Sequence, residues 1–514
     1  LYRAVEHGNF STIGYAKTEG PLSIIERNEK FPALDPINVD LDGGTWLPIL
    51  LNAPDEFSLP EPIATNTPTY TREINEIKSY QANLSAEQAR IIKYWSVGGV
   101  LRWNEIMQGL VAKYNRPPYQ NPDGTYPAPS AANPFNNPQF PFANPPYAAR
   151  AYAYVSAAQY DAMIATWHYK TLYNREAPFV VDPTLKVLVP KSTLPSYPSE
   201  DGVLCGVTVE ILKLLFPTEI AFIQQKADEH KLSRIISGAN VRSDVEEGII
   251  LGRKIASKFI SKAATDNAGA AIGTPEIWNQ LEVNMIANGE IPWRSLDLPS
   301  RPPMLPLFGN VKSMLMTPQD FIDNKPPPPP STNSPLFKAE LAEVKAYMNN
   351  NNMEYKRIVT YWADGVGTYT PPGHWNAIAI RYFVPERFSE IRWARNMALL
   401  NIALMDAAIG CWAAKYEYFN PRPSQVDPSI KTSTGIPNFP AYVSGHSTFS
   451  GAAATYLSYV LPSKTEEFND MAQEASMSRL YGCIHYRSDC EAGLLLGKNI
   501  GEFAVSRAQI DGAD

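Results

Sequence analysis

The sequence predicts an all-α protein made of two related helical bundles. Two long segments, 147–170 and 394–419, carry apolar residues at helical spacing along their whole length. Alternating strand patterns are scarce elsewhere in the chain. The two helical segments also resemble each other residue by residue, which indicates an internal duplication.

Adding 245 to a position in the first half of the chain repeatedly gives the same residue in the second half. The register holds without a gap from Arg150 and Arg395 to Gly248 and Gly493, across loops and prolines. A looser match, RIIKYW at 90–95 against RIVTYW at 357–362, precedes it at another offset. We therefore expect two bundles packed around a pseudo-twofold axis. Identical pairs include Asp161 and Asp406, Trp167 and Trp412, Lys170 and Lys415, Ser199 and Ser444, Arg234 and Arg479, and Asp244 and Asp489.

Local composition, and above all the positions of proline and glycine, divides the chain into four parts. Residues 1–76 are rich in Pro, Asn and Gly and predict an extended N-terminal region wrapped on the surface. We assign 77–265 to the first bundle, 266–345 to a proline-rich connection, and 346–514 to the second bundle. Within the connection, the five prolines at 326–330 predict a stiff polyproline spacer more strongly than a ligand for a proline-reading domain.

Bulk properties exclude some classes of function. With 514 residues and 44% hydrophobic content, the chain can bury a large core. Lys and Arg number 45 against 52 Asp and Glu, a net charge of −7, and no basic run follows. Nucleic acid is therefore not an expected partner. The sequence contains no run of roughly 18 uncharged apolar residues, so no membrane-spanning helix is predicted.

The chain starts at Leu1, which favours a processed or truncated start and an exported protein, whether periplasmic, surface-bound or extracellular. Its four cysteines form no CxxC pair and predict buried free thiols, with a local disulfide between Cys483 and Cys490 as the less favoured alternative. His7, His168 and His230 are assigned to the surface or to packing.

The two copies differ in their charged residues and in their histidines. Ser444-Gly445-His446 stands opposite Ser199-Glu200-Asp201 in the first copy. Arg422 stands opposite Ala177, and His485 opposite Asn240. The first copy keeps Lys170 and Arg234 but has gained acids. A site for an anion is therefore expected in the second bundle.

Three cationic residues, Lys415, Arg422 and Arg479, define that expected site. Ser444 and Gly445 precede an apolar run that reads as a helix, so its unpaired N–H groups would face the same point. Glycine lets an anion approach this backbone closely. Converging positive charges repel one another unless a multiply charged oxyanion lies among them. Phosphate and its structural relative vanadate both fit this requirement.

Two histidines and an acid complete the constellation. Asp489 follows His485 by one helical turn and would fix its tautomer, as a nucleophile or metal ligand requires. His446 would then serve as the acid and base on the other side. Each motif alone is commonly a helix cap or a surface feature, but their combination within one repeat predicts a reactive site.

The pattern of Lys415-x6-Arg422-Pro423, Ser444-Gly445-His446 and Ser478-Arg479-x5-His485-x3-Asp489 resembles the signature of the type 2 phosphatidic acid phosphatase and vanadium-dependent haloperoxidase superfamily. Val443 departs from it, because the family usually has proline before Ser-Gly-His. FPAYVSGHSTF (439–449), Trp412 and YWADGVGTYTPPGHWNAI (361–378) are similar to stretches of fungal vanadium chloroperoxidases, whereas algal bromoperoxidases carry histidine in place of Phe439.

The resemblance implies a vanadium haloperoxidase that oxidises halide with hydrogen peroxide. Lys415, Arg422, Ser444, Gly445 and Arg479 would hold the vanadate oxygens. His485 would bind the vanadium, with His446 as acid and base and Asp364 paired with Arg479.

Three further residues have weaker assignments. Trp412 and Phe439 would line the halide side, although plain core aromatics are an equal alternative. His374 would lie near the entrance or serve only the turn. A second hypothesis, acid phosphatase, uses the same residues: a phosphomonoester would transfer its phosphoryl group to His485, and phosphate would occupy the vanadate site.

Overall fold

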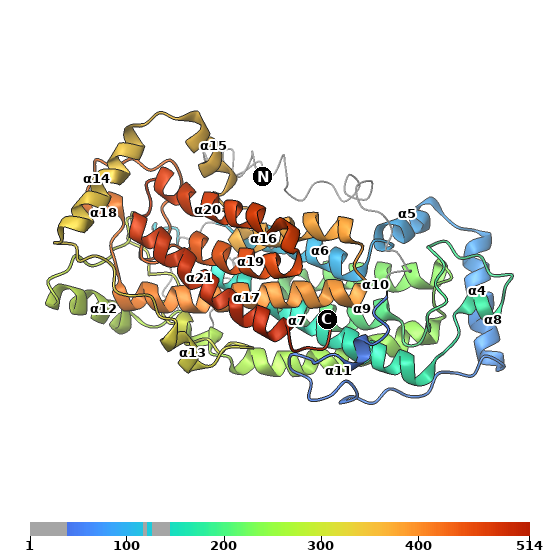
Figure 1. Ribbon diagram of the computed structural model, residues 1–514. Coiled ribbons are helices and arrows are strands. Elements are labelled where there is room, and N and C mark those ends of the chain that lie inside the picture. Colours follow the sequence, from blue (N-terminus) through green and yellow to red (C-terminus); the bar gives the residue numbers. More distant parts are fainter. Residues whose placement is uncertain (1–38, 117–120, 126–143, 514) are drawn as a thin grey trace.

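The computed structural model describes residues 39–116, 121–125 and 144–513, and within these ranges the chain forms helices and no strand. The all-α prediction is therefore confirmed (Figure 1). The first half contains α4 (Pro68–Ala82), α5 (Ala86–Trp95), α6 (Gly99–Tyr114), α7 (Pro145–Tyr173), α8 (Pro178–Val181), α9 (Glu200–Leu215), α10 (Ile220–Ile236) and α11 (Arg242–Thr265). The second half contains α12 (Pro275–Ala287), α13 (Pro318–Asp323), α14 (Pro335–Asn349), α15 (Met353–Tyr361), α16 (Thr370–Phe383), α17 (Glu390–Tyr418), α18 (Pro423–Val426), α19 (Gly445–Val460), α20 (Thr465–Tyr481) and α21 (Arg487–Ala508).

Helix boundaries in the two halves follow the offset of 245 found in the sequence. Helices α7, α8, α9 and α10 begin and end 245 residues before α17, α18, α19 and α20, and α11 begins 245 residues before α21. A bond near the N-terminus of each core helix repeats as well: Arg150 pairs with Asp266 at 2.6 Å, and Arg395 pairs with Asp511 at 2.7 Å.

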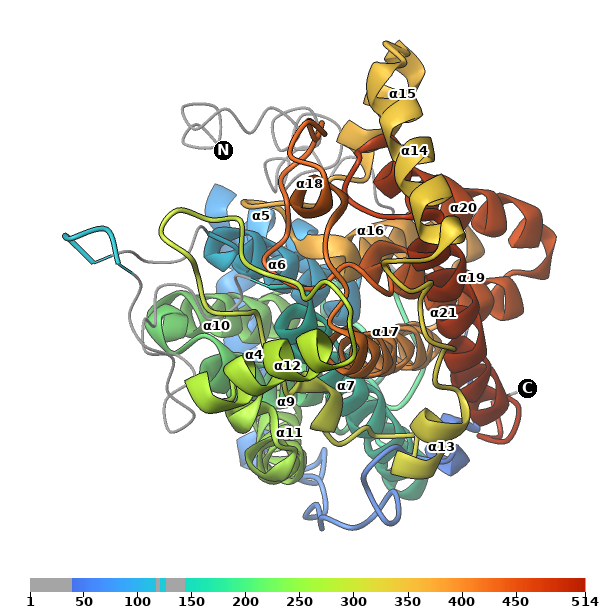
Figure 2. The ribbon, with the colours of Figure 1, turned by 90° about the vertical axis from the view of Figure 1, so that its left-hand side faces the viewer.

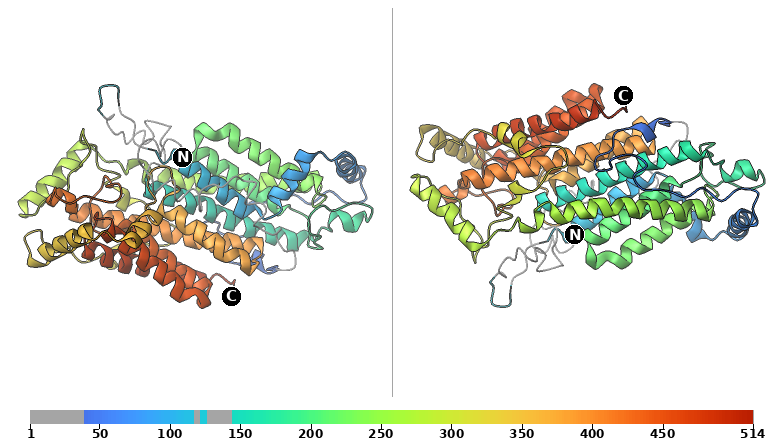
Figure 3. Two further views of the ribbon diagram at one scale, coloured as in Figure 1. Left: turned by 90° about the horizontal axis from the view of Figure 1, so that it is seen from above. Right: turned by 90° about the horizontal axis from the view of Figure 1, so that it is seen from below.

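Helices α7 and α17 form the centre of the molecule. They lie side by side along its long direction and are enclosed by the other helices (Figures 2 and 3). Asn401 on α17 donates to Ser156 on α7 at 3.1 Å, and these two residues occupy the same position in the two copies. A position on a twofold axis meets its own counterpart, so this bond marks where the pseudo-axis crosses.

Helix α17 is buried on nearly all sides because it is apolar on nearly all sides. The segment Glu390–Val426 is long and apolar enough to cross a membrane by length and composition, and 94% of its most apolar window is buried inside the protein. Asp406, a charged residue in the middle of α17, is buried too.

Extended segments are tied to these helices by side-chain hydrogen bonds. Asp161 on α7 accepts from the backbone N–H groups of Ile49, Leu50 and Leu51 at 2.6 to 2.9 Å. In the second half, the hydroxyls of Tyr418 and Tyr442 donate to the carbonyls of Pro326 and Pro327. The proline run is therefore held by the chain's own tyrosines, in agreement with a spacer.

The cysteines and His230 can be compared directly with the sequence predictions. Cys205, Cys411, Cys483 and Cys490 are buried free thiols, so the alternative of a Cys483–Cys490 disulfide is wrong. His230 is a packing residue, stacked on Trp95 at 4.0 Å. His7 and residues 1–38 of the predicted extended N-terminal region lie outside the described residues.

Glycines set the close packing of one helix pair in each bundle. A Cβ at Gly497 of α21 would lie 2.1 Å from the carbonyl oxygen of Thr448 on α19, and one at Gly252 of α11 would lie 2.2 Å from that of Val203 on α9. Both contacts are with backbone, which cannot move aside without shifting a whole helix.

We expect Gly497→Ala and Gly252→Ala each to lower the free energy of unfolding by about 1–3 kcal/mol through overpacking. The control is Gly109→Ala in the interior of α6, where a Cβ meets no atom within 4 Å. Alanine there should raise stability by about 0.5–1 kcal/mol. Urea unfolding followed by circular dichroism measures all three, and similar effects from the three substitutions would contradict this account.

Candidate active site in the second bundle

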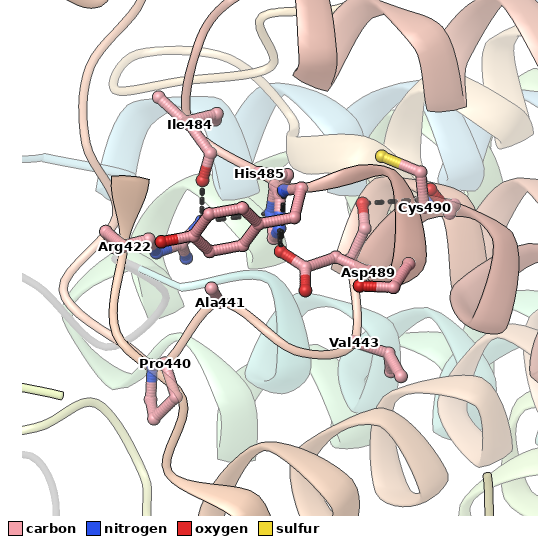
Figure 4. Close-up of polar contacts among 12 residues, drawn as sticks. Arg422, Pro440, Ala441, Val443, Ile484, His485, Asp489 and Cys490 are labelled. Atoms are coloured by element: carbon pink, nitrogen blue, oxygen red, sulfur yellow. Dashed lines mark hydrogen bonds and ion pairs between the residues drawn. The ribbon is translucent and has the colours of Figure 1, made fainter. Parts of the chain in front are cut away.

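Part of the predicted site lines a cavity of about 220 Å³ at one end of the second bundle, whereas Lys415, Arg422, Ser444, His374 and Asp489 are not among its lining residues. Trp412, Phe439, Gly445, His446, Arg479 and His485 line it. They come from α17, from the loop before α19 and the first turn of α19, from the last turn of α20, and from the turn between α20 and α21. Figure 4 shows His485 of that turn beside Arg422 and Asp489.

Local structure explains how each cationic side chain reaches this point. Helix α17 ends at Tyr418, and Phe419 turns the chain away with φ 41°, so Lys415 lies in the last turn. Arg422 is the N-cap of the short helix α18, fixed in extended conformation before Pro423. Ser444 is the N-cap of α19, and its side chain accepts from the N–H of Ser447.

Lys415, Arg422 and Arg479 are almost completely buried, at 0%, 0% and 1% exposure. Their hydrogen bonds go chiefly to backbone carbonyls: Lys415 to Pro440 and Ala441, Arg422 to Phe439 and Ile484, and Arg479 to Trp362. Among the residues that the structure describes, no carboxylate lies within 4 Å of any of the three cationic groups. Three buried positive charges thus lack an ion-pair partner, a costly arrangement unless an anion completes it.

Burial is also the main influence on the acidity of these groups. It lowers the pKa of Lys415 to about 7, helped by the nearby charge of Arg422. It lowers the pKa values of Arg422 and Arg479 to about 10. The site therefore holds its charges at an electrostatic cost, which a bound oxyanion would relieve.

His485 is held by Asp489 in the orientation that the sequence predicts. Its Nδ1 lies 2.8 Å from Asp489 Oδ2, which also accepts from the N–H of Tyr486 at 3.0 Å. A carboxylate accepts, so Nδ1 carries the proton and Nε2 is left with a lone pair. Nε2 accepts from Arg422 at 2.9 Å. Burial and the neighbouring cations lower the pKa of His485 well below its usual value, so the imidazole is neutral at neutral pH.

His446 lines the cavity from the first turn of α19. Burial, followed by the charge of Arg479, lowers its pKa well below the usual value for histidine. Its Nε2 lies 3.7 Å from Oδ2 of Asp364.

Asp364 differs from expectation in its partner. The predicted ion pair with Arg479 is not formed within 4 Å, although the charge of Asp364 supports the protonated form of Arg479. The carboxylate instead accepts from Nδ1 of His374 at 3.0 Å. His374 is fully buried, so it is neither an entrance residue nor part of an exposed turn.

Trp412 and Phe439 form an aromatic wall beside the cations. Their ring centroids are 5.0 Å apart. Lys415 Nζ lies 4.9 Å from the centroid of the Phe439 ring, and the Arg422 guanidinium carbon lies 5.1 Å from it. Both aromatic residues line the cavity, as predicted, while they also pack in the core.

The equivalent cleft of the first bundle is neutralised from within. Arg234 lies 2.8 Å from Asp201, and Lys170 lies 3.6 Å from Glu200. The substitutions that distinguish the copies therefore cancel the first copy's positive charge, which supports the placement of an anion site in the second copy alone.

Sequence reasoning missed the part of the cavity wall that comes from outside the second bundle. Asn115, Arg116 and Pro145 from the first half line the cavity, as do Arg301 and Met304 from the connection. They belong to no motif, and only the packing of the two halves brings them to the site.

The fold and site together define an all-α protein with three buried cationic side chains beside a neutral histidine. The family described as PAP2 superfamily matches residues 396–507, which contain Lys415, Arg422, Arg479, His446 and His485. The match lies within the second bundle and agrees with the resemblance of its motifs to that superfamily. No curated protein matches the chain.

One solved structure agrees with this fold. A bacterial vanadium-dependent iodoperoxidase has a TM-score of 0.57 and 24% sequence identity, covering 71% of this chain and 91% of its own. A holo-type bacterial vanadium-dependent chloroperoxidase has a TM-score of 0.49 and 13% identity, covering 74% of this chain and 96% of its own.

Oxyanion affinity should fall as pH rises above about 7. Sulfate keeps its charge across this range, whereas Lys415 loses its proton near pH 7 in the free protein. Burial raises the pKa of Asp489 to about 7, so this carboxyl group also becomes more negative as pH rises and disfavours the anion. By linkage, the dissociation constant for sulfate should rise by up to about tenfold per pH unit. Calorimetric titration from pH 6 to 9 measures this, and Lys415→Met should bind more weakly with a shallower slope. An equal slope in the variant would contradict the assignment to Lys415.

Proposed function

We propose that this protein is a vanadium-dependent haloperoxidase. In the overall reaction, one halide ion, one hydrogen peroxide and one proton give one hypohalous acid and one water. The observation that carries the proposal is the set of three buried cations without a carboxylate partner, gathered around the lone pair of His485.

The residues present fit vanadate. Arg422 Nη2 is buried without a hydrogen-bond partner, so it has a donor to offer to an oxyanion. A Cβ at Gly445 would stand in contact, at 3.9 Å, with the rings of Phe449 and Trp412, so the glycine keeps this space beside the helix N-terminus free of a side chain. Lys415, Arg422, Arg479, Ser444 and Gly445 would hold the oxygens, with His485 Nε2 as the metal ligand. Phosphate fits the same cradle.

The chain's own groups supply positioning and proton transfer. Bound vanadate would act as a Lewis acid that polarises peroxide without changing its own redox state. Asp489 keeps the proton of His485 on Nδ1. His446 would accept and return a proton on the cavity side. The aromatic wall of Trp412 and Phe439 offers a poorly hydrated surface to a halide.

Acid phosphatase is the competing function, because the same constellation serves phosphoryl transfer. His485 Nε2 would attack the phosphorus of a phosphomonoester, and His446 would protonate the leaving oxygen. The PAP2 match is compatible with both reactions. The chloroperoxidase-like flanks around Phe439 and Asp364 and the apolar cavity wall favour the haloperoxidase.

Protein loaded with orthovanadate should oxidise iodide or bromide with hydrogen peroxide, measured as triiodide absorbance or as bromination of an indicator dye. The unloaded protein should hydrolyse p-nitrophenyl phosphate far more slowly than the vanadate-loaded protein oxidises halide. Efficient phosphatase turnover without any halide oxidation would reverse the two assignments.

His485→Ala should abolish either activity, because it removes the only nitrogen placed to bind vanadium or phosphorus in the described site. The matched control is Asn240→Ala at the equivalent position of the first bundle. Asn240 donates to the carbonyl of Ser196 within the neutralised cleft, so its loss should leave the activity within about twofold of wild type. Equal losses from both variants would contradict the assignment of the reaction to the second bundle.

A further inference from the structure

A buried chain of three side chains runs from the cavity into the protein: His446, Asp364 and His374. Asp364 lies between the two rings, with Oδ2 at 3.7 Å from His446 Nε2 and Oδ1 at 3.0 Å from His374 Nδ1. We propose that His374 is a positioning residue that fixes the Asp364 carboxylate, so that His446 keeps its proton on Nε2 and presents Nδ1 to the reaction. The role of His446 in this inference rests on the proposed function.

His374 is the group that holds Asp364. Both carboxylate oxygens lie near its Nδ1, at 3.0 and 3.2 Å. Among the described residues, no other hydrogen-bond donor to this carboxylate is present. Asp364 has a side-chain exposure of 1% and a left-handed backbone with φ 45°. A buried carboxylate with one donor loses its orientation when that donor is removed.

The ring of His374 is itself fixed. It is fully buried in the second turn of α16, stacked on Trp362 at a centroid distance of 4.5 Å and edge-on to Tyr361 at 4.9 Å. The carbonyl of Trp362 accepts from Arg479. The histidine, the acid and one cation of the oxyanion site are therefore set by one rigid aromatic unit.

The tautomer of His446 follows from the direction of the carboxylate. An ionised carboxylate accepts hydrogen bonds only, so it favours a proton on the nitrogen that faces it. The nitrogen that faces Asp364 is Nε2, which lies 3.7 Å from Oδ2, beyond direct hydrogen-bond distance, and has no hydrogen-bond partner among the described residues. A proton held there by the charge of the carboxylate leaves Nδ1 as the base. The charged and titratable groups that face His446 from other elements are Arg479, Lys415, His374 and His485, all of which disfavour an imidazolium, whereas the backbone carbonyl of Trp362 favours one. Asp364 is the acid within 4 Å that favours one.

The test compares His374→Phe, which keeps a ring but removes the donor, with His374→Asn, whose amide N–H can replace Nδ1–H. The whole chain has six histidines, so labelling with ¹⁵N-histidine gives a simple spectrum of ring nitrogens. In the unloaded protein we expect His446 to be the Nε2–H tautomer. In His374→Phe it should become a mixture of tautomers, and His374→Asn should restore the single form. An unchanged His446 tautomer in His374→Phe would overturn the inference, whichever reaction the protein catalyses.

Turnover gives the second readout. In the vanadate-loaded protein, His374→Phe should lower kcat by about 10- to 100-fold. The limb of the pH profile that reports His446 should move to lower pH, because the imidazolium loses its counter-charge. KM for halide and the sulfate affinity of the unloaded protein should stay within about twofold, and His374→Asn should recover most of kcat.

Two outcomes of these assays would contradict a positioning role. One is a parallel loss of kcat and sulfate affinity, which indicates damage to the fold of the site. The other is a loss of kcat in His374→Asn equal to that in His374→Phe. If the wild type hydrolyses phosphomonoesters and oxidises no halide, the proposed function fails, while the same series read by phosphatase turnover still tests His374.

Discussion

Positive charge buried without an ion-pair partner is the constraint on which this structure depends. Moving an ammonium or guanidinium group out of water costs several kcal/mol, and here three such groups meet. The protein meets part of this cost with backbone carbonyls from the loop before α19 and the turn after α20. The remainder is available as binding energy for an anion, which makes the site selective for charge before any chemistry begins.

The duplicated architecture shows how such a site is supported. The helices that carry the cations pack on a first bundle of the same layout, whose own cleft is neutralised by internal ion pairs. The first bundle therefore contributes mainly support, and the second carries the cations that lack an ion-pair partner. The contact between them is not passive, because Asn115 and Pro145 of the first half complete the cavity of the second.

Sequence predicted the all-α class, the offset between the repeated helices and the cluster of cations, because helical period, cap residues and a fixed spacing are local or periodic signals. The tautomer of His485 was also predictable from Asp489 one turn later. The partner of Asp364 was not predictable in this way. The resemblance implied an ion pair with Arg479, whereas in the structure the carboxylate accepts from His374, whose ring is stacked on Trp362. The docking of the proline run on Tyr418 and Tyr442 likewise depends on contacts between distant segments.

The neutralised cleft of the first bundle has a consequence for substitutions in that half. Because its acids already balance its bases, a substitution in this cleft changes a local salt bridge and leaves the cationic residues of the second bundle in place. Asn115, Arg116 and Pro145 are different, because they line the cavity of the second bundle. The first half can therefore alter the shape of that cavity through these residues without changing any cation of the site.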